Sequence, residues 1–170
     1  DYYIATLISR LFDDGVTSRL QKILREEKGL VYSVECRTTS LPDTGTIDFD
    51  VSVRSEKVVE VAEILFNEIK KFILTGVSED ELELVKKRYG YDLDYELDDP
   101  YRQIIRYGFC HLYSTEITLE KEREKISQII PSDILKVARD IFVPEKLNFV
   151  LVGPYTSELK TRLKELVHSF

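Results

Sequence analysis

Arg25 and Tyr32 are the two residues whose chemistry and spacing first suggest a function. They stand seven positions apart in the stretch LREEKGLVYSVE, on either side of Gly29. Arginine carries a permanent charge on a planar group that fits carboxylates and carbonyls. A positioned tyrosine hydroxyl can donate a hydrogen bond to an oxygen that becomes negative. Each residue also has a structural interpretation: a core tyrosine with its hydroxyl at the rim, and an arginine stabilised at a helix C-terminus.

The sequence offers few strong metal ligands. Cys36 and Cys110 form no CxxC arrangement, and His111 and His168 are too far apart to share one helix face. We therefore predict no metal site and no bound cofactor in this chain, and we interpret both cysteines as buried free thiols. The adjacent Cys110 and His111 are interpreted as helix packing.

A helix followed directly by a strand must position Arg25 and Tyr32. Apolar spacing predicts a helix that begins after Thr17 or Ser18 and ends at Gly29, a residue type favoured just beyond helix C-termini. From residue 30 to residue 38 the apolar period changes to two, as in a strand with one buried side. This pattern places Tyr32 on the same face as Val34 and Cys36.

A second strand is predicted to pair antiparallel with the first. Its apolar residues are expected to be buried, and these are Ile47, Phe49, Val51 and Val53. Asp48 and Asp50 alternate with them and, with Glu35, are expected on an accessible acidic face. Such a face is usually a solvated sheet surface, but inside a chamber it would attract basic peptides.

The rest of the chain is predicted to be mainly helical. Helices are expected over residues 4–12, from residue 58, after Ser78, from Pro100, after Thr118, after a cap at Ser132, and at the C-terminal end. The charged run KEREK, residues 121–125, is expected on an exposed helix face. The apolar run LNFVLVG predicts a central strand. The predicted fold class is therefore α+β: one domain over residues 1–170, with several long helices on one face of a largely antiparallel sheet.

Composition and charge exclude several functions. A formal net charge of -7 and a pI near 5.0 argue against nucleic acid or an anionic membrane as the main partner. The sequence contains no apolar run of the roughly 18 residues that a membrane span needs. The N-terminal stretch also lacks the pattern of a signal peptide. We predict a soluble protein and favour a cytoplasmic location.

Three stretches, in this order, resemble the second, non-catalytic domain of the pitrilysin-like zinc metallopeptidases. This family, the inverzincins, includes insulin-degrading enzyme and the mitochondrial processing peptidases. The stretches are DDGVTSRLQKILREEKGLVYSVECRTTSLPDTGTIDFDVSV, GVSEDELELVKKRYGYDLDYEL and IIPSDILKVARDIFVPEKLNFVLVGP. The similarity runs from about residue 1 to residue 154, and the block SRLQKILREEKGLVYSV is its most specific part.

The resemblance implies a role for the arginine and the tyrosine. In the family, a homologous domain with zinc on an H-x-x-E-H helix faces this domain across a chamber. This chain has no such motif. The resemblance implies that Arg25 and Tyr32 reach across the chamber to the peptide substrate and assist catalysis there. The expected partners are a peptide and an H-x-x-E-H catalytic domain or subunit. The chain is expected to be part of a zinc metalloendopeptidase and to be inactive when it is alone.

The chain departs from the family pattern in two places. A glycine-rich turn is common where this chain has Asp13, Asp14 and Gly15, and the edge strand that usually precedes the first helix is missing. The missing strand suggests a fragment or a separately expressed domain, and we expect a C-terminal fragment of a larger two-domain peptidase half. The alternative is a structural or peptide-binding scaffold with no role in hydrolysis. The presence of both Arg25 and Tyr32 favours the peptidase interpretation.

Overall fold

The fold is built on one β-hairpin whose apolar face is covered by helices. A computed structural model describes residues 2–41, 43–114 and 118–170. The two antiparallel strands are β1 (Val31–Ser40) and β2 (Gly45–Val53). The α-helices are α1 (Tyr2–Phe12), α2 (Val58–Thr75), α3 (Glu79–Leu97), α4 (Pro100–Leu112), α5 (Leu119–Gln128), α6 (Pro131–Ile141) and α7 (Ser157–His168). Three short helical segments are η1 (Gln21–Glu27), η2 (Ser55–Lys57) and η3 (Pro144–Lys146). The predicted α+β class is confirmed.

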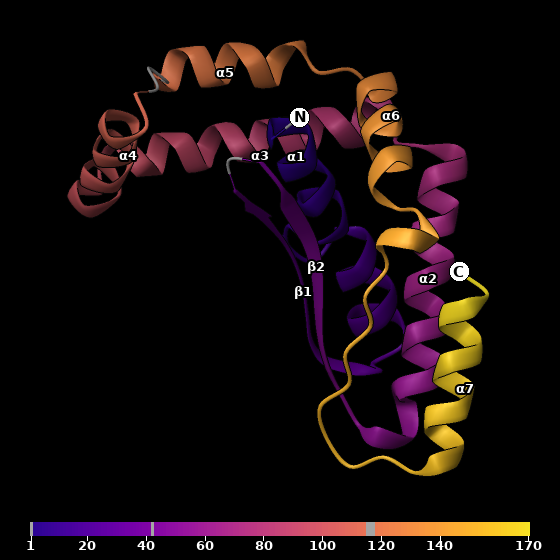
Figure 1. Cartoon of the computed structure of the whole chain (residues 1–170). Coiled ribbons are helices and arrows are strands. Elements are labelled where there is room, and N and C mark those ends of the chain that lie inside the picture. Colours follow the sequence, from indigo (N-terminus) through magenta and orange to yellow (C-terminus); the bar gives the residue numbers. More distant parts are fainter. Residues whose placement is uncertain (1, 42, 115–117) are drawn as a thin grey trace.

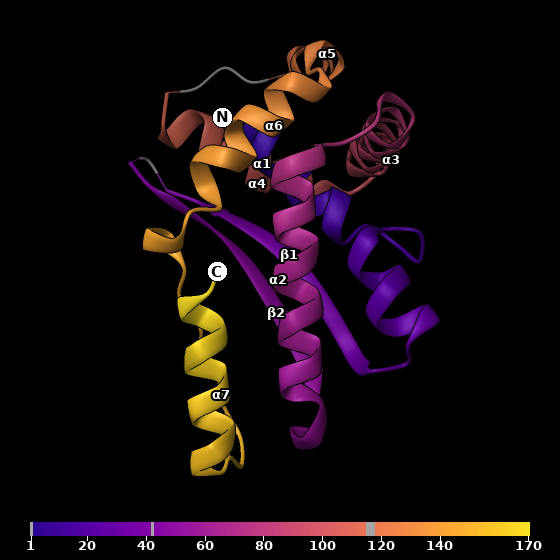
Figure 2. The same ribbon diagram turned by 90° about the vertical axis from the view of Figure 1, so that its right-hand side faces the viewer.

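The helices form two groups around the hairpin (Figure 1). Helices α1, α2 and α6 lie on one side of it, and α7 packs along α2. Helices α3 and α5 run across one end of the molecule, with α4 at their far end. Figure 2 shows α2 in front of the hairpin and α7 beside α2. The opposite face of the hairpin is left uncovered by these helices.

The hairpin faces follow the predicted alternation over most of their length, although the residues predicted to be buried on β2 are only partly buried: Ile47, Phe49, Val51 and Val53. Val34 and Cys36 are buried on β1, and the Phe49 ring of β2 packs edge-on against Phe12 of α1 at a centroid distance of 5.2 Å. Asp48 and Asp50 are exposed, as predicted. This register keeps two carboxylates out of the core, where their desolvation would be costly.

Most helix starts lie where the sequence predicts them. The Ser78 hydroxyl accepts the N–H of Glu81 at 3.2 Å, and an Asp99 carboxylate oxygen accepts the N–H of Tyr101 at 3.0 Å. These side chains satisfy backbone donors that a helix N-terminus leaves free. The start of α6 differs from the prediction because Ser132 lies inside the first turn. The Asp133 carboxylate instead accepts the N–H of Ile130 at 3.0 Å.

The predicted central strand over residues 147–152 is wrong. This segment is extended but belongs to neither strand of the described sheet. Among the described residues, no backbone hydrogen bond involves an N–H or C=O group of residues 148–155. The side chains of this segment nevertheless differ in packing: Phe149 packs against Phe66 of α2 at a centroid distance of 6.3 Å, whereas Val150 and Val152 are 81% and 91% exposed.

Candidate functional site

Arg25 lies in a helical turn of unusual geometry. The segment η1 is a π-helix, a form that occurs mostly as single turns and often at functional sites. Its neighbour Leu24 is fully buried and anchors the turn, while the Arg25 side chain is 54% exposed. The Nε atom of Arg25 lies 3.9 Å from a Glu26 carboxylate oxygen. This loose ion pair leaves the guanidinium available to a ligand.

Gly29 connects the Arg25 turn to the Tyr32 strand. Its φ is +57°, in the left-handed region that favours glycine. Its N–H donates to the carbonyl of Arg25 at 3.1 Å, and the N–H of Leu30 donates to the carbonyl of Leu24 at 2.8 Å. These two bonds close the helical turn and direct the chain into β1. The predicted helix end is therefore confirmed.

A β-bulge turns Tyr32 outward. Val31 pairs with Val53 and Ser33 pairs with Ser52, so β1 has one more residue than β2 over this step. Tyr32 is the extra residue, and its side chain is 87% exposed. The prediction that Tyr32 shares the face of Val34 and Cys36 is wrong because the bulge interrupts the two-residue period. The core-tyrosine interpretation fails with it.

Asp13 and Gln21 tie this region together along the free edge of β1. The Asp13 carboxylate accepts the backbone N–H of Cys36 at 3.1 Å and a Gln21 amide N–H at 3.0 Å. The same Gln21 amide donates to the carbonyl of Val34 at 2.9 Å. The side chains therefore occupy backbone groups that a third strand would otherwise bind. They hold η1 against β1, and thus Arg25 and Tyr32 on adjoining elements.

Sequence reasoning missed Asp13 and Gln21 as positioning residues. In the sequence, Asp13 is only a departure from a glycine-rich turn, and Gln21 is a polar residue of a predicted helix. Their partners lie on β1 and are set by the tertiary arrangement. The one sequence feature that could have indicated this role of Asp13 is an aspartate at a turn where the related proteins favour glycine.

The uncovered hairpin face is acidic. Glu35 faces Asp50 across the strands, and Arg37 faces Asp48. Arg37 also forms an ion pair with Glu35, and the Thr46 hydroxyl donates to an Asp48 oxygen at 2.7 Å. One cation among three carboxylates leaves this surface negative, which favours basic ligands.

The cysteines and histidines do not converge. Cys36 of β1 is buried. Burial raises the pKa of its thiol, so the thiol stays protonated and weakly reactive. Cys110 is only partly buried, and His111 on the same helix is exposed. Within the described ranges, no three His, Cys, Asp or Glu side chains lie close enough to hold a metal ion.

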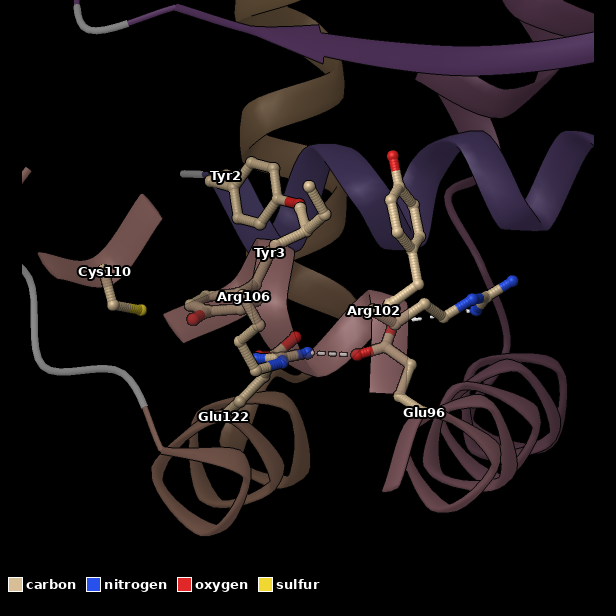
Figure 3. Close-up of a pocket in the computed structure, with 9 residues that line it drawn as sticks. Tyr2, Tyr3, Glu96, Arg102, Arg106, Cys110 and Glu122 are labelled. Atoms are coloured by element: carbon tan, nitrogen blue, oxygen red, sulfur yellow. Dashed lines mark hydrogen bonds and ion pairs between the residues drawn. The ribbon is translucent and has the colours of Figure 1, made fainter. Parts of the chain in front are cut away.

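A buried ionic cluster lies beneath α4 and was not predicted. Glu122 of α5 is only 5% exposed, although the KEREK run was expected on an exposed face. Its carboxylate accepts from Arg106 at 2.6 Å and from the Tyr89 hydroxyl. Arg106 also donates to Glu96 at 2.6 Å (Figure 3). The signal was present, since Glu122 lies three residues after Leu119 and four before Ile126, on the buried side of α5.

This cluster borders a cavity of about 410 Å³. Tyr2 and Tyr3 of α1 form one wall, and Arg102 and Cys110 of α4 line the other side (Figure 3). Burial, together with the charge of Glu122, raises the pKa of Tyr3 to about 12. Its hydroxyl is therefore neutral at physiological pH.

No helix within the described ranges is both long enough and apolar enough to cross a membrane. The cytoplasmic location stays a prediction.

Comparison with known proteins identifies related sequences. The family model described as the peptidase M16 inactive domain matches residues 1–89. An uncharacterized zinc protease of Streptomyces coelicolor is 25% identical over 154 residues, which are 90% of this chain and 33% of that protein. The chain spans about a third of the length of the curated relatives it matches.

Solved structures share the fold. The peptidase M16 inactive domain from Pseudomonas fluorescens superposes with a TM-score of 0.72 at 18% identity, over 84% of this chain and 34% of that chain. The first half of the periplasmic protease PqqL from Escherichia coli gives a TM-score of 0.67 at 17% identity, over 98% of this chain and 39% of that chain. At these identities the likeness concerns the fold alone.

Proposed function

Because this chain belongs to the peptidase M16 inactive-domain family, we propose that it is the substrate-binding half of a zinc peptidase. In this role it contacts the peptide and assists hydrolysis at a zinc site on a homologous H-x-x-E-H catalytic domain or subunit. The relatives named zinc proteases support this proposal. In this proposal the partner holds the zinc, and this chain is inactive without that partner.

The observation that carries the proposal is the exposure of Tyr32 at a bulge. Bulges are frequent beside active sites, where they change the direction of a side chain. A large aromatic side chain that is 87% exposed gains little from the fold that displays it. The Tyr32 hydroxyl can donate a hydrogen bond to a substrate carbonyl oxygen as that oxygen becomes negative during hydrolysis.

Arg25 complements this donor. Its guanidinium is permanently charged and only loosely paired with Glu26 at 3.9 Å. It can bind a carboxylate or a backbone carbonyl of the peptide and hold the scissile bond near Tyr32. Asp13 and Gln21 act as positioning residues, because they fix η1 to β1.

The test uses the peptidase assembled with its catalytic domain. Tyr32→Phe removes one hydroxyl from an exposed ring, so stability is unchanged, while loss of a transition-state donor lowers kcat roughly 100-fold. Tyr155→Phe is the matched control, because Tyr155 is also exposed and follows the 147–152 segment.

Arg25→Ala tests whether the guanidinium of Arg25 binds the peptide. If the guanidinium holds the peptide, the variant raises KM more than it lowers kcat, and Arg25→Lys restores only part of the affinity because the planar fork is lost. Arg162→Ala on α7 is the control. Wild-type kinetics for both Tyr32→Phe and Arg25→Ala would instead support the scaffold function, in which the fold serves assembly or peptide binding without hydrolysis.

A further inference from the structure

Helix α4 carries an apolar stripe that stays largely exposed among the described residues. Its members follow one another at helical spacings and are Tyr101, Ile104, Ile105, Gly108, Phe109 and Leu112. The five large side chains are exposed, Ile104 and Leu112 at 69% each. Every residue of α4 is described, and none of them is buried. The stripe therefore contributes little to the core.

The inward side of α4 is largely polar, although Tyr101 and Ile105, at the edge of the stripe, also line the cavity beside Tyr2 and Tyr3. Arg106 donates to Glu96 and to Glu122, each at 2.6 Å, and the Gln103 amide donates to the carbonyl of Glu96 at 2.6 Å. Figure 3 shows Arg106 directed toward Glu96 beneath the helix. A surface helix normally packs its apolar side inward and leaves its polar side in water. The orientation of α4 is the reverse, which indicates that another surface covers the stripe.

We propose that this stripe binds the same stripe of a second copy of the chain, with the two α4 helices antiparallel about a two-fold axis. Figure 1 shows α4 at one extremity of the molecule, beyond the end of α3, where a second molecule can approach. Isologous contacts of this kind are the commonest way in which identical chains associate.

The sizes of the stripe residues match under this symmetry. An axis between residues 106 and 107 places Ile105 opposite Gly108 of the second copy, Ile104 opposite Phe109, and Tyr101 opposite Leu112. Nothing lies within 4 Å of the position that a Gly108 side chain would occupy. A glycine inside a helix is less favourable than alanine, and no contact among the described residues requires it here. The open notch accepts Ile105 of the second copy and lets the two helices approach closely.

The charges of α4 permit self-association. The stripe itself carries none, and Arg106 is paired inward with Glu96 and Glu122. Arg102, at the edge of the stripe, lies 3.4 Å from Asp99 and is thereby partly neutralised. An anionic membrane is a poor alternative, because the chain has a formal net charge of -7.

The contact area sets the expected strength. A standard stable interface buries about 800 Å² on each partner, and a helix of 13 residues is only about 20 Å long. The dimer should therefore be weak, with a micromolar Kd. Salt should strengthen it, because screening reduces the repulsion between two copies of charge -7.

Sedimentation equilibrium of the 170-residue chain, from about 1 to about 200 µM, tests the proposal. The expected result is a monomer–dimer equilibrium that Ile105→Asp weakens at least about tenfold, because an unpaired carboxylate would be buried in the interface. Leu84→Asp, an exposed leucine on α3, is the matched control and should leave the dimer unchanged. Circular dichroism verifies that each variant folds.

Gly108→Ile gives the sharper test. This variant raises the helix propensity and apolar area of α4, and the space around the Cβ position of residue 108 is open among the described residues. It should nevertheless abolish the dimer, because it fills the notch. Stronger association of Gly108→Ile would show non-specific apolar adhesion and overturn the proposal.

Disulfide trapping tests the orientation. In a Cys110→Ser background, a mixture of Ile105→Cys and Gly108→Cys chains should form the mixed disulfide faster than either chain alone, because only facing positions come within bonding distance. A chain that stays monomeric overturns the proposal, as does a dimer that Ile105→Asp leaves intact. A monomer whose binding to a separate catalytic domain is lost in Ile105→Asp would assign the stripe to that domain and also overturn it.

Discussion

At the residue scale, Tyr3 should make the stability of the fold depend on pH in the alkaline range. The fold raises the Tyr3 pKa from 10.0 to about 12, chiefly through burial. The folded state therefore keeps a proton that the unfolded chain releases near pH 10, so this stabilisation is complete below pH 10 and is lost as pH rises toward 12. We expect the unfolding free energy of Tyr3→Phe to fall less steeply across this window, as measured by urea titration.

The exposed Tyr155→Phe is the control for the Tyr3 experiment, and its pH dependence should match that of the wild type. An unchanged slope in Tyr3→Phe would mean that the Tyr3 hydroxyl does not experience the burial described here.

The buried carboxylate of Glu122 should contribute strongly to the stability of the fold. Its carboxylate accepts from Arg106 and Tyr89 in a buried site, so Glu122→Ala leaves a buried cation with one partner fewer and a hydroxyl without its acceptor. We expect a loss of about 3 kcal/mol in the free energy of unfolding. Glu124→Ala, exposed on the same helix, should cost under about 0.5 kcal/mol. Equal effects of the two substitutions in chemical denaturation would contradict the assigned role of the cluster.

At the scale of elements, the segment over residues 147–152 should be the least protected extended part of the chain. Its backbone groups form no ladder within the described structure, whereas β1 and β2 pair over most of their length. Amide hydrogen exchange followed by mass spectrometry or NMR should therefore show exchange at Val150 and Val152 within about seconds at neutral pH, and much slower exchange in the β1–β2 ladder. Ladder-like protection at both positions would contradict the observed arrangement.

Elements that depend on local chemistry were predictable from the sequence. The caps at Ser78, Asp99 and Thr118 act on backbone groups two or three residues away, so their helix starts can be read directly. The apolar run over residues 147–152 predicts a strand, but a ladder also needs a partner strand, which no local pattern reveals.

The sequence proposes which residues form the candidate site, but it does not reveal how they are arranged in space. The resemblance singled out Arg25 and Tyr32, and the glycine between them was expected to end the helix. The direction of Tyr32 depends on a one-residue mismatch between β1 and β2, which appears only when the strands are paired. The side of α4 that faces inward could likewise not be predicted from the sequence, because the partners of Arg106 lie on α3 and α5.

At the scale of the whole molecule, the negative charge should influence which peptides the assembled peptidase prefers. The formal net charge is -7, and the uncovered hairpin face displays Glu35, Asp48 and Asp50. If that face lines the substrate chamber, a peptide with added lysines should have a KM severalfold lower than its glutamate counterpart. The difference should shrink at about 0.5 M salt, because surface charges are then screened.

Lys variants of Asp48 and Asp50 provide the control for this preference. They should reduce or reverse it without changing kcat for a neutral peptide. A preference that persists in these variants would place its origin on the catalytic partner.

The bulge at Tyr32 also makes position 32 suitable for protein engineering. Because this side chain is the unpaired extra residue of β1 and projects away from the core, its replacement should not require repacking of neighbouring residues. The backbone determines the direction in which the side chain points, and the choice of residue determines which chemical group is placed there. Histidine, a fluorophore or a photoreactive amino acid introduced there would occupy the same location, so position 32 can report on, or chemically capture, whatever molecule approaches this end of the hairpin.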